Sequence, residues 1–304
     1  WRPPFLPSLL AAIFIAALYP NLGLTGGPLR PELTVNLFGV AVIFLISGLS
    51  LRLSQLATAA TNFKSNLFIQ CFSYALFPAA FLPLATALRG AVDSRLLTGV
   101  VVLSTLPISV NMCIMLTARA QGDLALAIFS AVLSNAAGVM ITPALVFALL
   151  GKKMTLPLGA VLSKLSRRVV LPLAVGLALR RSVAVRRGFD RRRAYASLLS
   201  EAVLLGVVYS TAKGLSGLAG FGGAAASSPG FLASAALLLG LPFLYVAMAG
   251  VSWLLARRLV RLPADQAVAA LYCSTHKTLA FGIPLIKTLF EGPDVSWITV
   301  PLLV

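Results

Sequence analysis

The chain has 304 residues, of which 59% are hydrophobic and only 11% are charged. Soluble domains typically contain roughly 45–50% apolar and about 25% charged residues. The composition therefore argues against a soluble enzyme, a nucleic-acid-binding domain or a secreted disulfide scaffold, and predicts an all-α, multi-pass integral membrane protein.

The net charge of +17 does not point to a nucleic-acid partner, because the basic residues gather between apolar stretches. Seven arginines fall between two of these stretches: Arg180, Arg181, Arg186, Arg187, Arg191, Arg192 and Arg193. Such a cluster is typical of a cytoplasmic loop of a membrane protein. We expect the lipid bilayer and a small-molecule or ion substrate as partners, and no nucleic acid.

Apolar stretches long enough to cross a bilayer recur along the chain, since a helix needs about 20 residues to cross roughly 30 Å of hydrocarbon. The sequence predicts ten spans, near residues 5–19, 33–51, 65–88, 96–118, 124–150, 169–179, 196–212, 231–256, 266–290 and 297–304. Residues 156–165 have amphipathic character, and residues 214–230, rich in Gly, Ala and Ser, predict a flexible connection. Because the chain starts without Met and stops inside an apolar run, we expect it to be trimmed at both ends.

The ten predicted spans divide near residue 152 into two halves of five. The first repeat covers residues 1–151 (helices 1–5) and the second covers 152–304 (helices 6–10, the last one truncated). An odd number of spans inserts the second half upside down relative to the first, which is an architecture of secondary transporters. Corresponding helices of the two halves should then be broken, and their broken backbones should form the site.

The fourth span carries a proline among polar side chains. Pro107 has no N–H and its ring crowds the carbonyl of Leu103, so we expect the helix to kink or break there. The polar side chains at the same depth are Ser104, Thr105, Ser109 and Asn111. The alternative is an ordinary kinked helix in which these side chains make packing contacts.

The ninth span, fourth of the second half, repeats this pattern. Its polar run comprises Ser274, Thr275, His276, Lys277 and Thr278. Gly282 and Pro284 follow as helix-breaking residues. Unpaired backbone groups at this depth are tolerated only where they are buried in protein or line a wet cavity, so both breaks are predicted to border a substrate or ion pathway.

Lys277 is the charged residue that sharpens this prediction. A lysine near the bilayer centre costs roughly 2.5–3.5 kcal/mol on insertion scales, so it usually faces a cavity. It could neutralise an anionic substrate, replace a coupling cation or exchange a proton during the cycle; the alternative is a lysine that snorkels to the interface. His276, the single histidine, is either a proton carrier or a hydrogen-bonded structural residue.

Several segments resemble the bile acid:sodium symporter superfamily, and within it the branch called sodium/bile acid cotransporter 7, with its bacterial and fungal relatives. The resemblance lies in residues 26–35, 47–51, 67–70, 142–143, 273–279 and 282–284. It implies ten helices in two inverted repeats, panel and core domains, broken fourth and ninth helices that cross, and secondary transport by alternating access. It also implies an alternative, because this branch is associated with restraining calcium entry: a non-transporting membrane regulator of calcium homeostasis.

The sequence departs from the sodium-coupled relatives of that superfamily. The positions of their fifth-helix hydroxyl ligands read Ala127 and Ala131, and the position of their ninth-helix glutamate reads Tyr272. Sodium prefers several oxygen ligands with a carboxylate among them, and neither interrupted segment has one. We therefore doubt coupling to two sodium ions, although Ser134, Asn135 and the freed carbonyls could form one weaker site. Sodium or a proton remains the expected coupling ion, with no resident cofactor or metal.

Enzymatic activity is not expected. The aspartates that an intramembrane protease would need lie in predicted loops or at span ends: Asp93, Asp123, Asp190, Asp265 and Asp294. The three cysteines, Cys71, Cys113 and Cys273, fall inside apolar stretches and are predicted to be free thiols. We expect the protein in a plasma membrane or bacterial inner membrane, with a secretory-pathway or organelle membrane as the alternative.

Overall fold

A computed structural model describes residues 15, 38–50, 62–151, 159, 163, 167, 170–212, 229–290 and 294–303. Within these residues the regular structure is helical, with two isolated β-bridges, Arg89–Val92 and Ile108–Lys277. Almost all of the first predicted span and of the amphipathic stretch 156–165 lies outside the described residues. The predicted flexible connection 214–230 does too, except for its last two residues, which begin a helix.

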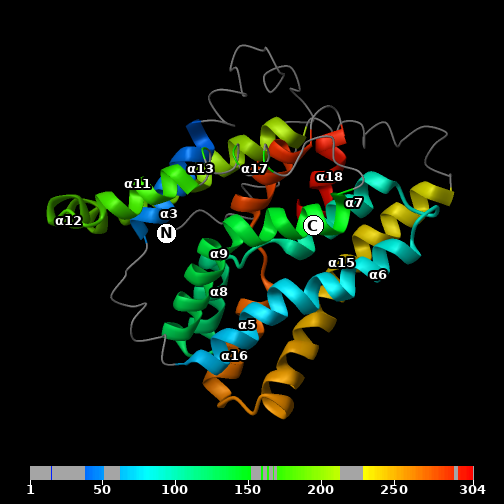
Figure 1. Ribbon diagram of the computed structural model, residues 1–304, viewed down its shortest axis with the longest axis horizontal. Coiled ribbons are helices and arrows are strands. Elements are labelled where there is room, and N and C mark those ends of the chain that lie inside the picture. Colours follow the sequence, from blue (N-terminus) through cyan, green and yellow to red (C-terminus); the bar gives the residue numbers. More distant parts are fainter. Residues whose placement is uncertain are drawn as a thin grey trace. The chain divides into compact units, whose positions relative to one another are not determined.

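The helices follow the predicted spans closely (Figure 1). In chain order they are α3 (Val40–Ser50), α5 (Phe63–Cys71), the π-helix η3 (Phe72–Leu76), α6 (Phe77–Ala87), α7 (Ser94–Thr105), α8 (Val110–Arg119), α9 (Leu124–Leu150), α11 (Leu171–Leu179), α12 (Val183–Arg191), α13 (Arg193–Ala212), α15 (Pro229–Leu254), the π-helix η9 (Leu255–Leu259), α16 (Ala264–Thr275), α17 (Leu279–Leu289) and α18 (Asp294–Leu303). Three described helices are long and apolar enough to cross a bilayer: Phe63–Ala87, Leu124–Leu150 and Leu232–Leu259. The part of the chain that the structure describes is thus helical, with three helices of bilayer length, and the count of ten spans stays a prediction.

Aspartates mark where two of these helices begin. Asp123 Oδ1 accepts a hydrogen bond from the N–H of Leu126 (2.9 Å), which caps α9 at the predicted residue. Asp93 Oδ1 caps α7 by accepting from the N–H of Arg95 (2.8 Å). The Arg95 side chain also pairs with Asp93 (Nη2–Oδ2 2.6 Å), and its hydrogen bonds hold the pKa of the Asp93 carboxyl below its usual range.

The arginine-rich segment predicted as a cytoplasmic loop is largely helical, and its cytoplasmic location stays a prediction. Ser182 has extended backbone angles (φ −69°, ψ 125°) that separate α11 from α12. Arginine and alanine are good helix formers, so this segment can coil once the chain has turned. Arg180 Nη2 lies 3.3 Å from Asp190 Oδ1, an ion pair that joins the turn to α12. No residue of α12 is buried, so its arginines remain exposed.

The chain divides into two compact units, each of which draws on both halves of the sequence. The described residues of the first unit fall within Trp1–Leu51, Thr155–Ala226 and Ile283–Thr299. Those of the second unit fall within Arg52–Met154, Ser227–Gly282 and Val300–Val304. The boundary predicted at residue 152 separates two sequence repeats, whereas these units are defined by contacts in space. The repeats 1–151 and 152–304 therefore remain a prediction.

In the first unit, α3 and α11 lie side by side through two glycines (Figure 1). A Cβ atom on Gly48 would clash with the backbone oxygen of Leu173, and one on Gly176 would clash with that of Leu45. The absence of side chains at Gly48 and Gly176 therefore sets the distance between the two helices, as small residues commonly do in membranes.

Gly48→Leu is expected to destabilise the first unit, because backbone atoms cannot move aside as a flexible side chain can. Overpacking of this kind typically costs about 1–3 kcal/mol, and a backbone clash lies at the upper end. Thermal melting of the purified protein in detergent measures the loss. Gly240→Leu in α15 is the matched control, since a Cβ there meets nothing within 4 Å. Equal melting temperatures for the two variants would contradict the prediction.

The second unit is built around α16, which packs against α5, α8, α9 and α15 (Figure 1). Polar side chains reinforce this packing between helices. Ser65 Oγ donates to Gln266 Oε1 (2.7 Å), which joins α5 to α16. Ser130 Oγ donates to Asn66 Oδ1 (2.6 Å), which joins α9 to α5. Hydrogen bonds of this kind stabilise helix association in a bilayer.

Candidate functional site

The fourth predicted span is interrupted between α7 and α8. Leu106 leaves the helix with extended angles (φ −68°, ψ 150°), and α8 begins only at Val110. The sequence predicted a kink or break at Pro107, and α7 ends at Thr105, just before it. A proline forces the residue before it out of the helical region, so Leu106 ends the helix. Its N–H still reaches the carbonyl of Leu103 (3.3 Å).

The ninth predicted span is interrupted between α16 and α17, at the polar run. His276 has extended angles (φ −74°, ψ 115°), and the helix resumes at Leu279. Gly282 and Pro284, expected to break the helix, lie inside α17. Gly282 instead makes room, because a Cβ atom there would lie 2.5 Å from Leu106 Cδ1.

The two interruptions pair with each other in the second unit. The N–H of Ser109 donates to the carbonyl of His276 (2.9 Å), and the N–H of Thr278 donates to that of Pro107 (2.9 Å). Ile108 and Lys277 therefore face each other as one antiparallel β-bridge. We call the segments 106–109 and 276–278 the crossing. The crossing supplies the hydrogen bonds that both interrupted helices lack.

The remaining backbone groups around Pro107 form hydrogen bonds with the side chains of Lys277 and of three residues of α9. These bonds run from Thr142 Oγ1 to Thr105 O (2.8 Å), from Lys277 Nζ to Leu106 O (3.0 Å), from Asn135 Nδ2 to Ile108 O (2.7 Å) and from the N–H of Ile108 to Ser134 Oγ (3.1 Å). Buried backbone groups need such partners, and each carbonyl from Thr105 to Ile108 has one. The break is therefore held in a fixed conformation.

Lys277 inserts its ammonium group between the crossing and η3. Nζ donates to the carbonyl of Ser73 (2.8 Å), to Ser73 Oγ (2.7 Å) and to the carbonyl of Leu106 (3.0 Å). It also lies 4.7 Å from the ring centroid of Phe77 and 5.8 Å from that of Tyr74. Three oxygens and two aromatic rings thus surround the half-buried side chain, and we call this set of groups the lysine cage.

The carbonyl of Ser73 is available because of a π-helical turn and a proline. In η3 the N–H of Phe77 bonds to the carbonyl of Phe72, five residues earlier. The same spacing assigns the carbonyl of Ser73 to residue 78, which is proline and has no N–H. Such π-helical turns often occur at functional sites, and this one leaves an acceptor for Lys277.

His276 lies on the other side of the bridge, next to α15. The hydroxyl of Tyr245 is 2.7 Å from Nδ1 and 2.8 Å from Nε2, and Nδ1 is 3.1 Å from the carbonyl of Tyr272. The Tyr245 and His276 rings meet edge to face at 5.1 Å. Tyr245 also contacts Thr275 Oγ1 (3.3 Å), so it joins α15 to the end of α16.

Most of the other predicted site residues contact their own helix or a neighbouring helix. Ser104, Thr105 and Thr275 each donate to a carbonyl of their own helix, those of Val101 (2.6 Å), Val102 (2.8 Å) and Leu271 (2.7 Å). Ser274 Oγ pairs with Ser252 Oγ of α15 (2.6 Å). Ser109 and Thr278 take part through their backbones. Asn111 belongs to α8, and its side chain lies outside the described part of the chain.

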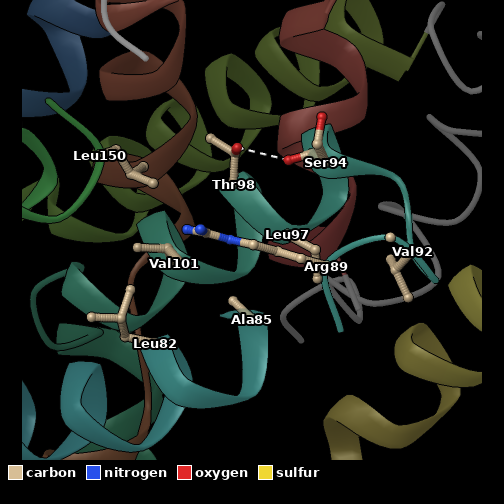
Figure 2. A pocket seen from close by; sticks show the side chains of 10 residues that line it. Leu82, Ala85, Arg89, Val92, Ser94, Leu97, Thr98, Val101 and Leu150 are labelled. Atoms are coloured by element: carbon tan, nitrogen blue, oxygen red, sulfur yellow. Dashed lines mark hydrogen bonds between the residues drawn. The ribbon is translucent and has the colours of Figure 1, made fainter. Parts of the chain in front are cut away.

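A hollow of about 210 Å³ lies elsewhere in the second unit, between α6, α7 and the end of α9 (Figure 2). Its lining is mostly aliphatic, including Leu82, Leu97, Val101 and Leu150, and Arg89 extends among these side chains. None of the predicted site residues lines it. The candidate site is therefore the crossing with its lysine cage.

Sequence reasoning missed five residues of this site: Ser73, Tyr74, Phe77, Thr142 and Tyr245. Tyr74 donates its hydroxyl hydrogen to the carbonyl of Ser134 (2.7 Å) and so joins η3 to α9. A tyrosine inside an apolar span is a usable signal, because its hydroxyl needs a partner at that depth. For Ser73 the usable signal is Pro78, because a proline five residues later has no N–H to bond to the Ser73 carbonyl.

Helices of bilayer length together with two interrupted helices that pair at their breaks define a membrane transporter. The chain belongs to the SBF-like CPA transporter family, whose family model matches residues 3–304. It is 34% identical to sodium/bile acid cotransporter 7 of Danio rerio over 307 residues, covering 99% of this chain and 88% of that protein.

Other relatives match over the same extent. Sodium/bile acid cotransporter 7 of Mus musculus is 33% identical over 99% of this chain and 87% of its own length. An uncharacterised protein of Pseudomonas aeruginosa is 28% identical over 99% of this chain and 89% of its own length. These matches confirm the resemblance found in the sequence and the prediction of a membrane transporter.

Proposed function

We propose that the chain is a secondary carrier that works by alternating access and moves an organic or other anion without a requirement for sodium. The observation that carries this proposal is the crossing, where the backbones of two interrupted helices pair in one compact unit. In transporters of this architecture, substrates and ions bind where interrupted helices meet.

The proposed preference for an anion rests on charge. The crossing contributes Lys277 and His276, and no acidic side chain is among its residues 106–109 and 276–278. The interrupted helices α8 and α17 also begin beside it, and helix N-termini favour negative charge. An anion near the crossing would therefore find a favourable potential.

The proposed independence from sodium rests on how the oxygens around Pro107 are used. The carbonyls of Leu106, Pro107 and Ile108 each accept a hydrogen bond from the protein. Ser134 Oγ accepts from the N–H of Ile108 and contacts the Tyr74 hydroxyl (3.0 Å), and Asn135 Nδ2 donates to two carbonyls. Three carbonyls and the Ser134 hydroxyl that could have contributed to one weaker sodium site thus already take part in hydrogen bonds.

Purified protein in proteoliposomes is expected to take up an anion at equal rates, within about a factor of two, in sodium and in potassium buffer. Because the relatives' names mention bile acids, these are the first probes, followed by steroid sulfates and inorganic anions in a thermal-shift screen. Two controls are used: empty liposomes, and liposomes that contain sodium/bile acid cotransporter 7 of Mus musculus. A steep sodium requirement would overturn sodium independence, and no flux with any anion would favour the alternative of a non-transporting calcium regulator.

A further inference from the structure

The lysine cage has the ligand set of a cation site. Two of its three oxygens are backbone carbonyls, which can accept hydrogen bonds but cannot donate them. The third is the hydroxyl of Ser73, which can turn its lone pairs towards a cation. Carbonyl oxygens arranged in this way can replace the hydration shell of a monovalent ion.

The two rings favour positive charge at the same point. Nζ lies 4.7 Å from the centroid of Phe77, within the distance at which a ring face attracts a cation, and Tyr74 adds a second ring at 5.8 Å. An ammonium group has three donors for the three oxygens, so its hydrogen-bonding capacity is fully used. It has no donor left for a transported anion in this conformation.

The cage is also assembled independently of the lysine side chain. The Ser73 carbonyl is freed by η3 and Pro78 within a single membrane-length helix. The Leu106 carbonyl is freed by the end of α7 before Pro107. Removing the lysine head would therefore leave both carbonyls in place and without their donor.

From this geometry we propose that the Lys277 ammonium is a built-in monovalent cation, and that the cage binds a free monovalent cation once this side chain is removed. The inference rests on the proposed function only in explaining why no sodium is required. Nζ–oxygen distances of 2.7–3.0 Å suit ammonium, methylammonium or potassium better than the smaller sodium ion.

The test is thermal melting of purified Lys277→Ala in detergent with methylammonium, ammonium, potassium or sodium chloride, against choline chloride at equal ionic strength. Methylammonium replaces Nζ and Cε, two of the four heavy atoms that the substitution removes, so it is expected to raise the melting temperature by about 3 °C or more at saturation. Ammonium and potassium should follow, and sodium should act least. The unsubstituted protein should not respond, since the Lys277 ammonium already fills the cage.

Adding Ser73→Ala to Lys277→Ala removes one oxygen ligand and is expected to weaken methylammonium binding about tenfold. If Lys277→Ala is recovered folded only when methylammonium is present during purification, that result also supports the cage. No response to any of the four cations, or no recovery in any of these salts, would overturn the proposal. The readout is binding, so a lack of anion flux would contradict the proposed function and leave this result unchanged.

Discussion

Lys277→Met is expected to reduce anion uptake in proteoliposomes at least 100-fold and to lower the melting temperature by roughly 5–10 °C. Methionine replaces the lysine side chain as far as Cε and has no donor, so the carbonyls of Ser73 and Leu106 stay buried without the donor that Nζ provides. Each such group costs about 1–3 kcal/mol, and about 1 kcal/mol shifts the melting temperature of a protein this large by roughly 2–4 °C.

The uptake measurement has to be normalised to folded protein, so that lost stability is not counted as lost transport. Lys64→Met is the matched control, because Lys64 is an exposed lysine at the start of α5. It should leave both uptake and melting unchanged. Uptake of Lys277→Met at the level of Lys64→Met would remove the lysine from the transport mechanism, whatever its effect on stability.

Helix positions were predictable wherever local chemistry decides them. The bounds of α9 match the prediction because Asp123 caps its first turn and no charge interrupts the 27 residues that follow. Pro107 correctly predicted the break in the fourth span, because a proline disfavours helical backbone angles at the residue before it. Pro284 gave a false signal, because α17 accommodates it as the sixth residue of the helix. A proline at that position removes one hydrogen bond of the helical ladder, yet α17 continues past it.

The partners of the site residues were not predictable from spacing. Lys277 was recognised as unusual, but its contact with Ser73 joins residues 204 positions apart. The hydroxyl of Tyr245 meets His276 from a helix that otherwise reads as uniformly apolar. Spacing within one helix reports which side chains share a face, and it carries no information about which face of a distant helix lies opposite.

Gly138 is the position at which a single side chain should do the most damage to the crossing. A Cβ atom there would lie 2.7 Å from the Tyr74 hydroxyl and 2.8 Å from Pro107 Cβ. Gly138→Leu must therefore push α9 away from the break between α7 and α8. The displacement would separate Ser134 and Asn135 from Ile108, and we expect little folded protein or a melting temperature at least 10 °C lower, with no uptake.

Gly138→Ala tests the same contacts with one added atom, which would lie 2.7 Å from the Tyr74 hydroxyl and 2.8 Å from Pro107 Cβ. Tyr74→Phe removes the hydroxyl oxygen from this contact but also its hydrogen bond to Ser134, so the double variant should lose less stability than the sum of the two single losses. Such coupling between two neighbouring substitutions is direct evidence of their contact. Gly250→Leu in α15 is the control, because a Cβ there meets nothing within 4 Å. If Gly138→Leu were as stable and active as Gly250→Leu, α9 would not hold the crossing in place, and the bonds from Ser134 and Asn135 to Ile108 could not be what fixes the break.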